Sequence, residues 1–180
     1  GIASSFVKFF TQSEYSHCGI ILKDPTFINS SLKGYYVWES SFEGTPDAED
    51  GNIKLGVQII PLQQVLDNYK QNGYVYVRKL KGNNRTLFNK TNFKKIHRIV
   101  SNKPYDLNVK DWINALVNYD AEPQKTDRFW CSALVGLVLT KLGVLDEHTD
   151  WSILRPSDFG SESENLGLVN DFYFEKEIQL

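Results

Sequence analysis

Hydrophobic and polar positions along the chain change their period about halfway. In the first 80 residues, short runs rich in Val, Ile, Tyr and Phe are bounded by Gly, Pro, Asn and Asp, which is the pattern of β-strands. Helical spacing interrupts them at residues 2–10 and again at 61–69, where Pro61 suits the first turn of a helix. Four strands are predicted: EYSHCGIILKD (14–24), GYYVWESS (34–41), LGVQIIP (55–61) and GYVYVRKL (73–80).

Helical spacing dominates the second half of the chain. A helix is predicted within residues 85–101, and the clearest two are VKDWINALVN (109–118) and CSALVGLVLTKLG (131–143). Gly143 stands where a glycine commonly ends a helix. The tail GLVNDFYFEKEIQL (167–180) fits a last strand. Strands early and helices late indicate an α+β fold, and 180 residues suggest one domain over residues 1–180.

The charge of the chain argues against one broad class of partner. The formal net charge is -2, whereas binding to nucleic acid phosphates needs a basic surplus, so we expect no nucleic-acid partner. One basic stretch, residues 79–98, fits either a solvated helix face or contact with an anionic surface, which allows peripheral membrane contact. The longest apolar run, residues 133–139, is far too short to cross a bilayer.

The two cysteines, Cys18 and Cys131, cannot make a disulfide framework. A single bridge between them is one reading, but two free thiols in a reducing compartment are simpler, and no signal peptide is visible. We therefore expect a cytoplasmic protein. The Cys and His residues are not clustered with the spacing of metal ligands, so neither a metal site nor a cofactor is expected.

Cys131 is the first candidate for chemistry. With Thr126 and Asp127 as plausible caps upstream, it falls in the first turn of the helix at 131–143. Unpaired N–H groups and the positive end of the helix dipole stabilise a thiolate at that position, and a thiolate is the form that nucleophilic catalysis needs. The alternative is a small buried hydrophobe in an apolar helix.

A nucleophilic thiolate needs a base, and His17 is the best of the three histidines. His97 and His148 lie in polar surroundings and are expected at the surface, whereas His17 is embedded in an apolar strand, where a hydrogen-bonded core histidine is the alternative. Glu39, at the end of YYVWE, reaches His17 if the two strands pair. Strand alternation turns Cys18 to the face opposite His17, which predicts a core thiol outside the site.

Four segments together resemble a known family. YSHCGIIL resembles the histidine strand of the NlpC-type, papain-like cysteine hydrolases, and FWCSALVGLVLTKLG resembles their nucleophile helix. KPYDL (103–107) resembles their Pro-Tyr segment, and RPSDF (155–159) matches a segment after the cysteine helix. The order here, histidine before cysteine, resembles the circularly permuted branch of the family. Within this branch the chain is most similar to YiiX-like proteins and a poxvirus protein, which are related to lecithin:retinol acyltransferase-like enzymes. Residues 79–127 match poorly.

The resemblance implies a fold and a mechanism. The fold would be a permuted papain-like domain, with an antiparallel sheet packed against the helix that carries the nucleophile. Cys131 would attack a carbonyl and form a thioester, His17 would shuttle the proton, and Glu39 would hold the imidazole. Backbone N–H groups at the start of the Cys131 helix would hold the oxyanion, with Ser132 and Tyr105 as further candidates for oxyanion or substrate binding.

Three functions follow as hypotheses. The first is a cysteine hydrolase that cleaves an amide in a peptide or isopeptide. The second is an acyl hydrolase or acyltransferase that acts on a lipid ester by the same thioester chemistry. The third is a catalytically inactive module that binds a partner. A polar cleft at Cys131 would favour the amide substrate, and a deep apolar pocket would favour the lipid.

Overall fold

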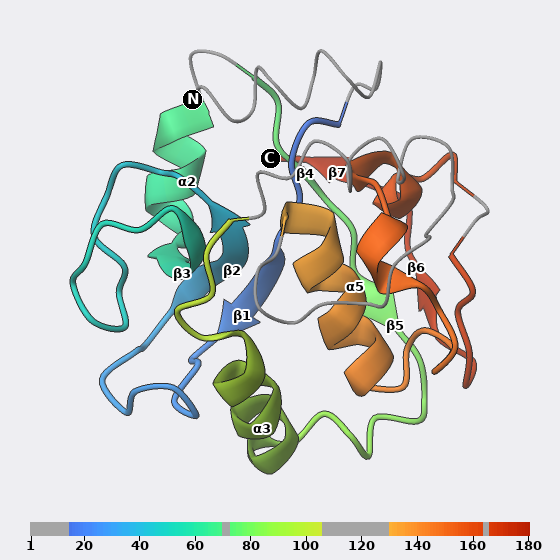
Figure 1. The fold of residues 1–180 in the computed structure, drawn as a ribbon. Coiled ribbons are helices and arrows are strands. Elements are labelled where there is room, and N and C mark those ends of the chain that lie inside the picture. Colours follow the sequence, from blue (N-terminus) through green and yellow to red (C-terminus); the bar gives the residue numbers. More distant parts are fainter. Residues whose placement is uncertain (1–14, 70–72, 106–129, 164–165) are drawn as a thin grey trace.

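A three-stranded antiparallel sheet forms the first part of the fold, in the order β1-β2-β3 (Figure 1). Its strands are β1 (Ile20–Lys23), β2 (Tyr35–Ser41) and β3 (Gly56–Pro61). The central strand β2 is buried from Val37 to Ser41, and its aromatic and β-branched residues suit a strand. The computed structural model describes residues 15–69, 73–105, 130–163 and 166–180.

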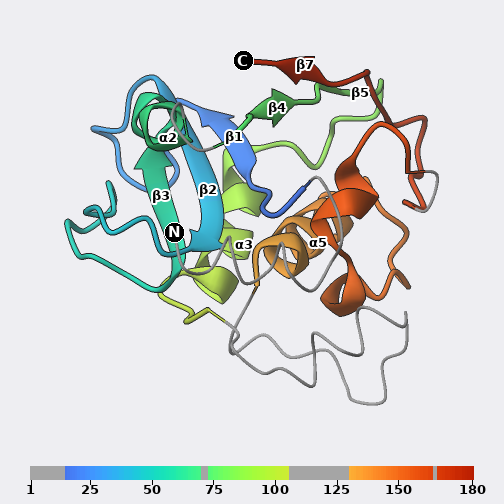
Figure 2. The same ribbon diagram turned by 90° about the horizontal axis from the view of Figure 1, so that it is seen from above.

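Side chains alternate between the two faces of this sheet, as strand geometry requires. On one face, Trp38 and Ile59 belong to the large core that includes α3 and α5. On the other, Val37 and Ile60 pack with Val65 of α2 (Leu62–Tyr69). Viewed from above, α2 lies on the opposite side of the sheet from α3 and α5 (Figure 2).

The two helices on the large-core side differ in how their ends and faces are built. Helix α3 (Lys90–Val100) begins after Asn89, whose side chain accepts a hydrogen bond from the Asn92 N–H at 2.9 Å. Helix α5 (Cys131–Lys141) is apolar on every side and is buried from Cys131 to Leu139. Gly143 follows it with φ +66°, the left-handed conformation that glycine adopts readily after a helix.

The C-terminal part forms two small sheets beside α5. Strand β4 (Tyr76–Val77) pairs with β7 (Ile178–Gln179), and β5 (Leu80–Lys81) pairs with β6 (Tyr173–Phe174). Two short 3-10 helices, η1 (Trp151–Ile153) and η2 (Pro156–Phe159), follow α5. The run 73–80, predicted as one strand, is therefore split. Arg78 lies at the split, with its guanidinium bonded to the carbonyls of Phe159, Gly160, Phe174 and Glu175.

The structure confirms the α+β class and most of the predicted elements. Three helices and small antiparallel sheets make up the described residues, and α3 packs against the β1-β3 sheet, where the His97 ring contacts the Trp38 ring. The predicted helices at 2–10 and 109–118 lie outside the described residues. No helix in the described part of the chain is long and apolar enough to span a membrane.

Gly56, the first residue of β3, lies directly against residues 103–105, the segment that carries Tyr105. Its φ is +148°, and a Cβ there would clash with the carbonyl oxygen of Lys103 and lie 2.8 Å from the Pro104 Cα. Both contacts are to backbone, which cannot move aside as a side-chain tip can. Gly56 therefore lets residues 103–105 lie against the end of β3, where the Val57 N–H bonds Lys103 at 2.9 Å.

Gly56→Ala is expected to lower the free energy of unfolding by at least about 2 kcal/mol, because backbone strain and overpacking act together. Gly167→Ala is the matched control, since a Cβ there meets no atom within 4 Å. It should change stability by less than about 0.5 kcal/mol. Urea unfolding of both variants measures this, and equal midpoints would contradict the constraint at Gly56.

Candidate active site

His17 and Glu39 form a direct pair at the end of the sheet. The His17 Nε2 lies 2.7 Å from the Glu39 Oε2, with the His17 side chain 18% exposed and that of Glu39 0% exposed. Gly19 makes the approach close: a Cβ at this position would lie 2.9 Å from the Val37 Cγ1 and 3.2 Å from the Glu39 Cβ. Because residue 19 has no side chain, the chain before β1 can lie close to β2. The contact between the two side chains confirms the predicted proximity of His17 and Glu39.

The second oxygen of Glu39 is bound from the sheet itself. The Ser41 hydroxyl donates to the Glu39 Oε1 at 2.9 Å and accepts from the Gln58 amide at 2.7 Å. Gln58 lies opposite Glu39 in the β2–β3 register, and its Nε2 is also 3.4 Å from the Glu39 Oε1. The carboxylate is thus held by groups on two strands, and it can orient His17 rather than follow it.

Cys131 is the third residue of the candidate site, and it comes from helix α5 rather than from the sheet. It is the first residue of α5 and is 2% exposed, and the charge of His17 acts on its thiol. A hydrogen bond from Cys18 and the charge of His17 hold the pKa of the Cys131 thiol well below its usual range, although burial acts in the opposite direction. The thiolate is therefore the favoured form.

His17 shows the complementary behaviour. Burial by itself would lower its pKa, but the charge of Cys131 and the hydrogen bonds to Cys131 and Glu39 raise the pKa of His17 well above its usual range. Both shifts favour the thiolate form of Cys131 and the imidazolium form of His17. These forms supply a nucleophile and a proton donor before any substrate binds.

Cys18 also reaches this site, and the prediction that it would stay apart was wrong. Its side chain lines the same cavity as His17 and Glu39. The prediction applied strand alternation to residues 15–19, but β1 begins only at Ile20. The second part of the prediction fits better, because Cys18 does pack against the large hydrophobic core. Both thiols are free.

The two additional site candidates have structural neighbours that limit their roles. The Ser132 hydroxyl donates to the Leu154 carbonyl at 2.5 Å, so this side chain ties the start of α5 to the segment before η2. Tyr105 is 6% exposed and packs in the large core, and its N–H donates to the Leu55 carbonyl at 3.2 Å. The predicted caps Thr126 and Asp127 lie outside the described residues.

The other polar residues expected at the surface divide into two groups. His148 is exposed, as predicted, with 86% of its side chain accessible. His97 is not: its ring packs on Trp38 and its Nε2 lies 3.0 Å from Glu49. The acidic loop after β2 also predicts a solvated Asp47, but Asp47 is 2% exposed and binds Lys54 of the same β2–β3 loop at 2.7 Å. Pattern reading missed Asp47 because the loop folds back on itself, and it missed His97 because Trp38 and Glu49 are far from His97 in the sequence.

Sequence reasoning also missed Tyr69, the last residue of α2. The charges of His17, Glu39 and Cys131 all act on its hydroxyl, which places the ring near the pair. Burial, followed by the surrounding carboxylates, raises the pKa of Tyr69. The helical pattern of residues 61–69 carried no signal for this, because only the fold of α2 over the sheet brings its end to the site.

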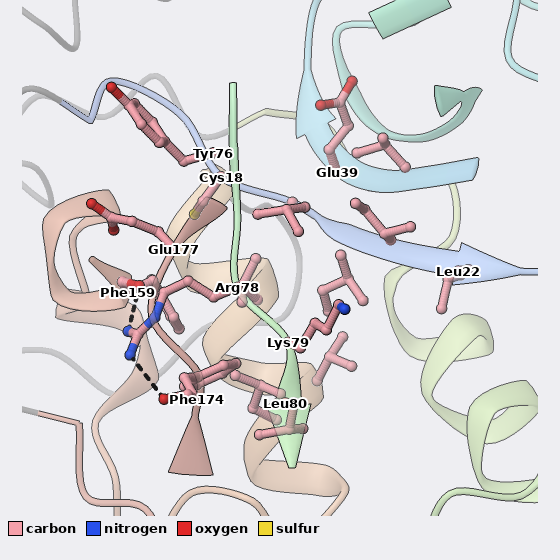
Figure 3. Close-up of a pocket in the computed structure, with 18 of the residues that line it drawn as sticks. Cys18, Leu22, Glu39, Tyr76, Arg78, Lys79, Leu80, Phe159, Phe174 and Glu177 are labelled. Atoms are coloured by element: carbon pink, nitrogen blue, oxygen red, sulfur yellow. Dashed lines mark hydrogen bonds between the residues drawn. The ribbon is translucent and has the colours of Figure 1, made fainter. Parts of the chain in front are cut away.

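A cavity of about 2360 Å³ opens beside the site and is lined by His17, Cys18 and Glu39 at one end. Strands β4 and β5 form one wall, with Leu80 farther along the same segment than Tyr76 (Figure 3). The dashed lines in Figure 3 show how Arg78 fixes this wall to Phe159 and Phe174. Helix α5 supplies an apolar wall made of Val135, Val138, Leu139 and Leu142.

In the residues that the structure describes, no group of three His, Cys, Asp or Glu side chains is placed to hold a metal ion. No protein-family model matches the chain, and neither a curated protein nor a solved structure is significantly similar to it. The chemistry of this site therefore has to be argued from its own geometry.

The rate of Cys131 alkylation by iodoacetamide should rise with pH at a midpoint well below the ~8.5 of a free thiol. His17→Ala should move this midpoint upward, since the imidazolium that favours the thiolate is removed. Mass spectrometry of the Cys131 peptide separates it from Cys18. His148→Ala, at an exposed histidine, is the control, and equal midpoints in the two variants would contradict the pair.

Proposed function

We propose that this protein is a cysteine hydrolase that cleaves an amide bond, in a peptide or isopeptide, through a thioester intermediate. The observation that carries the proposal is the His17–Glu39 pair at 2.7 Å, together with the opposite pKa shifts that His17 and Cys131 cause in each other. Nucleophile, proton carrier and orienting carboxylate are the three roles that this chemistry needs.

The reaction follows from the positions of the protons. The Cys131 thiolate attacks the amide carbonyl carbon, and the His17 imidazolium gives its proton to the leaving nitrogen as the C–N bond breaks. The product is a thioester on Cys131 and a free amine. Neutral His17 then takes a proton from water, and the resulting hydroxide attacks the thioester. The C–S bond breaks, which releases the carboxylic acid and restores the thiolate.

The start of α5 suits the negative oxygen of the tetrahedral intermediate. The first intrahelical bond runs from the Leu134 N–H to the Trp130 carbonyl at 3.1 Å, so the N–H groups of residues 131–133 precede this ladder. Because the hydroxyl of Ser132 is engaged by Leu154, Ser132 would contribute its backbone N–H rather than its side chain.

The permuted papain-like architecture belongs to the same proposal. It is supported by the order His17, Glu39, Cys131 along the chain, and by the contact of α5 with the central strand β2. It is also supported by RPSDF, whose Asp158 caps η2 by binding the Arg155 N–H at 2.8 Å. Two free thiols agree with a reducing compartment such as the cytoplasm.

Hydrolysis of a fluorogenic peptide and isopeptide panel tests the function. Cys131→Ala should abolish turnover, and His17→Ala should lower kcat/KM by about 10²–10⁴-fold. Wild-type activity should fall at acid pH as Cys131 is protonated, and at alkaline pH as His17 loses its proton. Glu39→Gln should move the alkaline limb to lower pH, because Glu39 helps to raise the pKa of His17.

Glu147→Gln is the control for the loss of a carboxylate, since the Glu147 side chain is 85% exposed. The activity of this variant should have the same pH profile as that of the wild type. Turnover that survives in Cys131→Ala would overturn the mechanism. If no substrate of the panel turns over while Cys131 keeps its acid-shifted alkylation, the amide assignment falls. The lipid ester or the binding module then remains.

A second candidate, the acyl hydrolase or acyltransferase acting on a lipid ester, has one specific observation in its favour. The cavity beside Cys18 and His17 has the apolar wall of α5 on one side, and Leu80 and Phe174 line it from the small sheets. An acyl chain that extends from the thioester carbonyl along this wall would gain hydrophobic binding energy. The same Cys131 chemistry would then act on an ester carbonyl.

Acyl p-nitrophenyl esters of increasing chain length separate this candidate from the first. If the chain occupies the cavity, kcat/KM should rise by up to about fourfold per methylene until the cavity is filled. Leu80→Trp should shorten the preferred chain, because it narrows the cavity. Ile99→Trp, on an exposed part of α3, is the control. If kcat/KM does not change with acyl chain length in either variant, the lipid ester is excluded as the substrate.

A further inference from the structure

Strand β1 has a free edge. In the described part of the chain the sheet runs β1-β2-β3, so β1 hydrogen bonds β2 on one side, and β4 pairs with β7 instead of with β1. Viewed from above, β1 forms the border of the sheet that faces β4 (Figure 2). A free strand edge presents a row of N–H and C=O groups that can pair with another extended backbone.

The register of the sheet shows which backbone groups point to this edge. The Asp24 N–H donates to a carbonyl just before β2 at 2.8 Å, which sets the phase of the β1–β2 ladder. Backbone groups of successive residues in a strand alternate between its two sides, so those of Ile20 and Leu22 face β2. The N–H and C=O groups of Ile21 and Lys23 therefore point to the free edge.

The cavity beside the site passes around this edge. Val37 packs on the α2 face of the sheet, Leu22 packs on the opposite face, and both line the cavity. A cavity lined from both faces must extend past one edge of the sheet. Strand β3, at the other edge, contributes none of the described lining residues, whereas residues 19–22 all line the cavity. The free backbone groups of β1 therefore face the cavity that His17 and Glu39 line at one end.

We propose that the amide substrate is a peptide bound in an extended conformation, as an added strand whose backbone pairs with the N–H and C=O groups of Ile21 and Lys23. The inference rests on the proposed amide hydrolysis and deepens it by naming how the substrate is held. His17 precedes Ile21 by four residues, which is about 13 Å of extended chain. The pairing therefore holds the peptide about four residues away from the bond that is cleaved.

The same edge argues for a peptide over a hydrocarbon chain in this part of the cavity. A hydrocarbon chain over β1 would remove the free N–H and C=O groups from water without giving them partners, which costs free energy. A peptide backbone supplies donors and acceptors at the spacing of a strand. Its side chains point alternately to the two walls, towards Val65 of α2 and Val138 of α5, which favours apolar side chains on both of its faces.

Amide hydrogen exchange, measured by NMR on Cys131→Ala, tests the proposal, because this variant cannot form the thioester. The probe is the panel peptide with the highest wild-type kcat/KM, added at about 100 times its Kd. Without it, the Ile21 and Lys23 amides should exchange quickly, because they face away from β2. With it, only the free protein exchanges quickly, so their exchange should slow by at least about tenfold. The amide of Glu147, an exposed residue outside the cavity lining, is the control and should keep its rate.

Ile21→Pro removes one N–H from the free edge and keeps the bonds between β1 and β2, since proline is tolerated where an edge N–H points outward. Ile21→Ala is the matched control, because it shortens the same side chain and keeps the N–H. The KM of the peptide should be about two- to tenfold higher in Ile21→Pro than in Ile21→Ala, which is the effect of one hydrogen bond. Equal KM values, or Ile21 and Lys23 amides that stay fast with the peptide bound, overturn the proposal. The exchange measurement keeps β1 unchanged, so it decides even where Ile21→Pro does not fold.

The failure of this inference is distinct from the failure of the proposed function. If a peptide is hydrolysed and Cys131→Ala abolishes that turnover, while the Ile21 and Lys23 amides stay fast, only this mode of binding is lost. If no peptide of the panel is hydrolysed, the proposed function is lost, and the added strand falls with it.

Discussion

The complete burial of the Glu39 carboxylate is the constraint on which the rest of the site depends. An ionised carboxylate with no exposed surface is stable only where several donors replace its water. Here the β2–β3 register supplies Gln58 opposite Glu39, and the strand period supplies Ser41 on the same face. These donors satisfy one oxygen. The other carboxylate oxygen contacts His17. This contact holds the chain before β1 against the end of the sheet.

The need for a charge partner extends from Glu39 through His17 to Cys131. His17 bonded to a buried carboxylate is favoured in its charged form, and a charged imidazolium in turn favours a thiolate on Cys131. Two negative groups then share one positive group in a buried place. The excess charge needs further donors, and the unpaired N–H groups in the first turn of α5 are placed to act as donors. Each of these groups is largely buried, and each charge therefore needs the next group as its partner.

The sequence predicted those features whose signal is local. The β-branched and aromatic run before Glu39, the apolar stretch after Cys131 and the left-handed Gly143 each depend on neighbours a few residues away, and all three were confirmed. His17 beside Glu39 also followed, because adjacent strands pair most readily. These signals were sufficient to find His17 and Glu39, which meet where the chain before β1 lies beside β2.

Features that depend on distant partners were out of reach of the same reasoning. Asp47 and His97 read as surface residues, but a loop lysine and the core ring of Trp38 remove them from water. Cys18 was misplaced because alternation was applied to residues that precede β1, and Tyr69 gave no signal at all. Each error concerns a polar group whose surroundings are set by the folding of a loop or by another element, and a periodic pattern contains no information about such surroundings.

The choice between amide and ester depends on which side of the carbonyl provides the binding energy. An amide nitrogen is a poor leaving group and needs a proton as the bond breaks, which the imidazolium of His17 is poised to give. An apolar acyl chain instead gains from the α5 wall of the cavity, which acts on the other side of the carbonyl. Since these two demands fall on different parts of a substrate, the proposed triad would determine the reaction and the cavity wall would determine its selectivity.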